Sequence, residues 1–72
     1  MDIVLERSGG VAGIEVKAAA TVTPGDFRGL RKLKAAAGKR FSSGVVLYDG
    51  ETSVGFGDSL YAVPVRALWE LV

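Results

Sequence analysis

The segment at residues 11–17 most constrains the fold, because its side chains alternate between the two faces that a β-strand presents. Ile14 and Val16 lie on one face of such a strand, whereas Glu15 and Lys17 lie on the other. A second alternating run precedes this segment, and a Ser-Gly-Gly sequence typical of tight turns separates the two. The pattern predicts a β-hairpin over residues 2–17 in which Ile14 and Val16 face inward.

The loop of this hairpin determines which residue lies opposite Asp2. A two-residue loop at Ser8-Gly9 places Asp2 opposite Glu15, and a loop at Gly9-Gly10 places it opposite Lys17. In either register Asp2 joins the face of Glu15 and Lys17, while Ile3 and Leu5 join the opposite, apolar face. Two carboxylates beside a lysine are a suitable site for Mg²⁺ or Mn²⁺. A solvated strand face with an ordinary ion pair explains the same spacing.

One main helix is predicted after the hairpin. Thr23 is a suitable N-cap, Pro24 suits the first helical position, and Gly38 is placed to end the helix. Its apolar stripe consists of Phe27, Leu30, Leu33 and Ala37. Arg28, Arg31 and Lys32 are neighbours on the helix surface and are candidates to contact nucleic-acid phosphates, although a solvated helix surface has the same composition.

Three further strands and a short helix complete the predicted order β-β-α-β-β-β-α. One strand is expected on each side of an Asp49-Gly50 turn, and a third strand is expected over residues 59–63. Pro64 then opens the last helix, with burial expected at Val65, Leu68, Trp69 and Val72. We therefore expect one α/β (α+β) domain over residues 1–72, with a small mixed, largely antiparallel sheet, one main helix and a short C-terminal helix.

Composition removes the usual reinforcements of a small core. The chain of 72 residues contains no cysteine and no histidine, so neither a disulfide nor a Cys/His zinc site can form. The absence of cysteine fits a cytoplasmic location, and the sequence shows no signal peptide and no apolar segment long enough to span a membrane. The apolar fraction of 49% is high for a lone domain, which indicates a surface that meets a partner.

A family resemblance covers nearly the whole chain in order. DIVLE, a Gly-rich turn, GIEVKAAATVTPGDFRGLRKLKAA, GKRFSSGVVLYDGE and FGDSLYAVPVRALW together resemble the PD-(D/E)xK nuclease-like fold. More closely, they are similar to a domain of unknown function found at the C-terminus of many prokaryotic AAA+-type ATPases.

The resemblance implies roles for individual residues. Asp2 and Glu15 match the metal-binding positions of the superfamily, with help from the Val16 backbone carbonyl, and Lys17 matches the position that orients water. The superfamily core is α-β-β-β-α-β, and the match starts at the motif Asp, so this chain is expected to be a truncated core or the tail of a longer protein with an upstream ATPase domain. The sequence itself contains no G-x-x-x-x-G-K-[ST] motif and is not expected to hydrolyse nucleotides.

Two functions follow as hypotheses. The first is an interaction or regulatory module of an AAA+-type ATPase, and the alternative is a metal-dependent PD-(D/E)xK nuclease that acts on DNA. The small core and high apolar content also predict a homodimer, with the contact formed by an uncovered sheet edge or by the face opposite Glu15.

Overall fold

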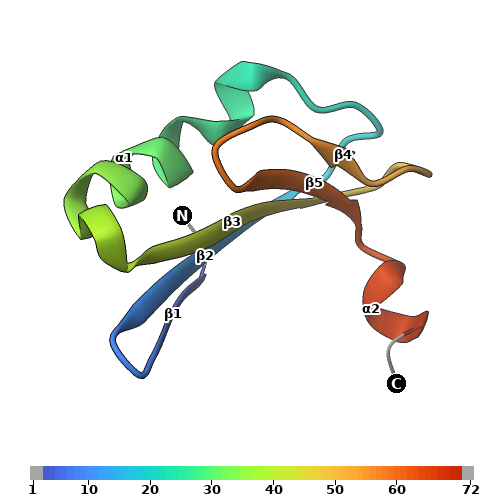
Figure 1. The fold of residues 1–72 in the computed structure, drawn as a ribbon. Coiled ribbons are helices and arrows are strands. Elements are labelled where there is room, and N and C mark those ends of the chain that lie inside the picture. The colour runs from blue at the N-terminus through green and yellow to red at the C-terminus, as the bar shows by residue number, and fades with distance from the viewer. Residues whose placement is uncertain (1–2, 71–72) are drawn as a thin grey trace.

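A computed structural model describes residues 3–70 of the chain and shows one five-stranded mixed sheet. The strands are β1 (Ile3–Arg7), β2 (Gly10–Lys17), β3 (Phe41–Tyr48), β4 (Val54–Gly55) and β5 (Leu60–Pro64), and they lie in the order β1-β2-β3-β5-β4. The main helix, α1 (Arg28–Ala37), lies on one side of this sheet, and α2 (Ala67–Glu70) follows beyond the end of β5 (Figure 1). The structure is therefore a small α+β fold.

The predicted hairpin is present, and its register is defined. β1 and β2 pair antiparallel with Ile3 opposite Ile14 and Arg7 opposite Gly10, so the loop is Ser8-Gly9. Ser8 and Gly9 both adopt positive φ, at 52° and 83°, which the tight connection requires. Asp2 lies outside the described residues, so its expected position opposite Glu15 stays a prediction.

The predicted main helix is present and ends at Gly38 as expected, but its first turn is a 3₁₀ turn and the α-helix itself begins at Arg28. The 3₁₀ turn η1 (Pro24–Phe27) leads into α1 after Thr23, and Gly38 closes α1 with a φ of 59°, a conformation that glycine adopts readily. A second 3₁₀ turn, η2 (Gly38–Arg40), connects α1 to β3. None of the helices within residues 3–70 has the length and apolar content needed to cross a lipid bilayer.

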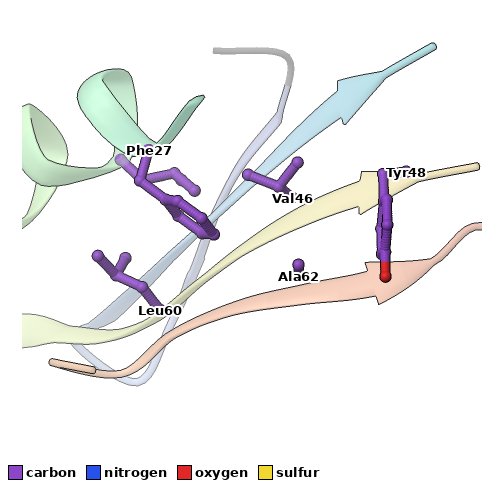
Figure 2. Packing of buried hydrophobic residues seen from close by; sticks show 6 residues of the cluster. Phe27, Val46, Tyr48, Leu60 and Ala62 are labelled. Atoms are coloured by element: carbon purple, nitrogen blue, oxygen red, sulfur yellow. The ribbon is translucent and has the colours of Figure 1, made fainter. Parts of the chain in front are cut away.

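The core lies between α1 and the sheet. Its buried members are Phe27, Leu30, Val46, Tyr48, Leu60 and Ala62. Figure 2 shows Phe27 reaching down from η1 toward Leu60 and Val46 on the strands. The Phe27 ring also packs against Phe56, with 4.6 Å between the ring centroids. The apolar stripe predicted for the helix thus faces the sheet, and its first two members are fully buried.

The sheet differs from the largely antiparallel arrangement that the sequence predicted. β2 pairs with β3 and β3 pairs with β5 in parallel, so antiparallel pairing is confined to the two edges. The chain after the Asp49-Gly50 bend does not fold back on β3. Instead β5 takes the place beside β3, and the two-residue β4 pairs with β5 at the edge. The crossover through α1 accounts for the first parallel pair, because parallel neighbours need a long connection.

The expected burial of the last helix is wrong for two of its residues. Leu68 is 46% exposed and Trp69 is 76% exposed, and the four-residue α2 contains no buried residue. Val65 is partly buried, and Val72 lies outside the described residues.

Candidate functional site

The two faces of the sheet have opposite surroundings, and the strand registers show which residues belong to each. Glu15 lies beside Val46 and Lys17 beside Tyr48, both core residues beneath the helix layer. Glu15 and Lys17 therefore share one face, as predicted, but this is the side on which η1 and α1 lie. The polar pair occupies the margin of the covered face.

The opposite side of the sheet is not covered by η1 or α1, and it is here called the open face. It consists of Ile3, Leu5, Arg7, Ala12, Ile14, Val16, Ser43, Val45, Leu47, Tyr61 and Val63. Four of its apolar side chains are about half exposed: Ile3, Leu5, Val16 and Tyr61. The prediction that Val16 faces inward is wrong, because the helix packs on the other side and Val16 is 54% exposed.

A shallow cavity of about 310 Å³ lies where β2 meets the start of the helix layer. Glu15, Lys17, Asp26 and Arg28 supply its charged lining. The Lys17 Nζ atom donates to Asp26 Oδ2 at 2.5 Å. Lys17 is thus joined to the helix N-terminus rather than to Glu15, and both side chains of the pair are about a quarter exposed.

Asp26 has a second structural role at the start of η1. The Thr23 backbone N–H donates to its carboxylate at 2.7 Å, and the Asp26 backbone N–H donates to the Thr23 carbonyl at 3.0 Å. The hydrogen bond from Lys17, followed by that from the Thr23 backbone, holds the pKa of Asp26 below its ordinary value of 3.8. The contact between Asp26 and Lys17 was not predicted from the sequence. The two residues are nine positions apart, on either side of a connecting loop, and no local sequence pattern predicts a contact across such a loop.

The ligand set proposed for Mg²⁺ or Mn²⁺ is only partly within the described residues. Glu15 and Val16 line the cavity, whereas Asp2 lies outside residues 3–70. Across that described range, no three Asp, Glu, His or Cys side chains cluster closely enough to hold a metal ion. The described part of the chain therefore does not by itself provide a complete oxygen-ligand site.

The basic residues proposed to contact nucleic acid lie on the solvent side of the helix. Arg28, Arg31 and Lys32 are all exposed, and Arg28 also borders the cavity. Lys34 lies one turn further on, and its Nζ donates to the Asp58 carbonyl at 3.0 Å, which joins α1 to the loop before β5. The three candidate residues form a small basic surface on a chain whose formal net charge is only +1.

Together these features define a small α+β domain with one helix-covered sheet face and one open apolar face. Residues 1–68 match the family described as Domain of unknown function (DUF4143), and the chain belongs to this family. No curated protein and no solved structure gave a significant match.

Proposed function

We propose that this domain is a protein-interaction or regulatory module of AAA+-type ATPases and has no ATPase activity of its own. The observation that carries the proposal is the open face, where Ile3, Leu5, Val16 and Tyr61 remain about half exposed around the buried Leu47. Extended apolar surfaces of this kind mark contacts with other proteins. The ATPase context is supported by the sequence resemblance, and a binding role accounts for the high apolar content without any catalytic step.

Photo-crosslinking at two matched valines tests whether the open face binds protein. Val16 on the open face and Val54 in β4 are 54% and 44% exposed, and Val54 pairs with core residue Ala62 on the covered side. Benzoylphenylalanine is placed at position 16 or 54, and the chain is produced in its native cells at natural levels. We expect a discrete protein adduct, identified by mass spectrometry, from position 16 alone. Equal adduct yields from both positions would contradict the proposal.

The alternative function is a metal-dependent nuclease of the PD-(D/E)xK type. It is favoured by one observation, the presence of Glu15 and Lys17 in the same cavity. The ion pair between Lys17 and Asp26 weakens this alternative, because it directs the Lys17 Nζ atom toward the helix N-terminus. A metal held by Asp2 and Glu15 would lower the pKa of a bound water molecule and would stabilise negative charge on a phosphoryl group.

Calorimetry with Mn²⁺ separates the two functions. The interaction-module proposal predicts equal heats for the wild-type chain and for Glu15→Ala. A heat that disappears in Glu15→Ala, together with cleavage of duplex DNA by the wild-type chain, would favour the nuclease. Arg31→Ala with Lys32→Ala then tests the basic surface, because loss of phosphate contacts flattens the salt dependence of DNA binding.

A further inference from the structure

We infer that the open face is covered by the open face of a second copy of this chain, which makes the domain a two-fold dimerisation module. This inference rests on the proposed interaction function and names the partner. Two sheets that pack face to face interdigitate their inner side chains at about 10 Å separation. A two-fold contact uses the same patch on both chains, so the patch must be complementary to itself.

The charge pattern of the open face satisfies that requirement. Its strand residues are apolar apart from Ser43 and Arg7, and Arg7 lies at the hairpin end of β1. The carboxylate of Glu15 and the amine of Lys17 lie on the other side of the sheet. Two copies placed face to face therefore bring no like charges together in the middle of the contact, where an unpaired charge would oppose association.

The strand registers also allow the open face to be complementary to itself. Tyr61 in β5 projects from one side of it and is 46% exposed. β5 and the β1–β2 hairpin are separated by β3. Tyr61 shares a cross-strand row with Val45 and Ile14, so a two-fold axis parallel to the strands and above β3 places Tyr61 of each copy over Ile14 of the other.

The accessible area of the chain supports an additional partner of moderate size. The chain exposes 4793 Å², whereas a folded monomer of its 7.5 kDa mass exposes roughly 4,250 Å². The excess of roughly 550 Å² approaches the area that each partner buries in a standard interface, about 800 Å².

Sedimentation equilibrium of four chains between about 1 and 100 µM tests the inference. We expect the wild-type chain to reach twice its 7.5 kDa mass. Val16→Lys should remain a monomer, because it places an unpaired charge within the apolar contact, and Tyr61→Ala should weaken association at least tenfold. Val54→Lys, a matched change of a 44% exposed valine on the covered side, should associate like the wild type. Circular dichroism confirms that all four chains are folded.

The outcomes separate this inference from the proposed function. A folded wild-type monomer at every concentration would overturn the dimer, and so would equal weakening by Val16→Lys and Val54→Lys. If the wild type is a monomer while position 16 crosslinks to a different protein, the partner is not a second copy of this chain, and the proposed interaction function stands. If the wild type is a monomer and position 16 gives no adduct, both fail.

Discussion

The contact between Lys17 and Asp26 assigns a definite role to a lysine that the sequence placed in a catalytic motif. The spacing of Glu15 and Lys17 correctly predicted a shared face, because strand periodicity alone requires it. It could not predict that the helix N-terminus would approach that face, since this depends on how the chain between β2 and η1 returns across the sheet. Lys17 and Asp26 join β2 to η1 at the edge of the core.

Acid should weaken the fold through Asp26. Its pKa is lowered in the folded chain, so its stabilising contribution is fully present above the ordinary value of 3.8 and is lost as the pH falls through the lower folded value. We expect the wild type to unfold at higher urea concentration than Asp26→Asn at neutral pH, and the difference to shrink below a pH of about 3.8.

Asp58→Asn is the control for this titration, because the Asp58 carboxylate lies 3.8 Å from Lys34 on an exposed loop and leaves the Lys17 contact intact. This variant should keep the acid sensitivity of the wild type. A difference between wild type and Asp26→Asn that is independent of pH would show that the carboxylate charge contributes nothing.

At the scale of elements, the sequence predicted what depends on local pattern and missed what depends on strand placement. The hairpin, the helix caps and the inward side of α1 follow from turn residues and periodicity, and all three are confirmed. The position of β5 between β3 and β4 is a choice among long-range pairings, for which a five-residue strand carries no local signal. The side of the sheet that α1 covers was likewise missed, because both faces of β2 offer apolar or small residues.

Gly44 shows how that choice is fixed by packing. A Cβ atom at Gly44 would lie 2.9 Å from Leu60 Cδ2 and 3.2 Å from both Leu30 Cδ2 and Phe41 Cζ. The helix side of β3 therefore has no room for a side chain at this position, since overpacking a core is costly.

Gly44→Ala should lower the free energy of unfolding by about 1–3 kcal/mol, because the surrounding side chains must shift. Gly55→Ala is the matched control in β4, where the added Cβ meets no atom within 4 Å, and its effect should stay within about 0.5 kcal/mol. Urea unfolding of both variants measures the difference. Equal effects would contradict the close approach of α1 to β3.

At the scale of the whole molecule, the open face is the feature that most needs a partner. The sequence predicted association from composition and named the face opposite Glu15 as one candidate contact. The structure adds which side chains are exposed there and which matched positions lie on the covered side. A domain without cysteine can be probed at these positions one thiol at a time.

The most direct test compares maleimide labelling of Val16→Cys and Val54→Cys at low and high protein concentration. In a single chain both positions are about half exposed, so both thiols should react at similar rates when dilute. We predict that labelling at position 16 slows at least tenfold at about 100 µM chain, while labelling at position 54 keeps its dilute rate. Equal rates at both positions that do not depend on concentration would contradict the account of the open face as the contact between two copies.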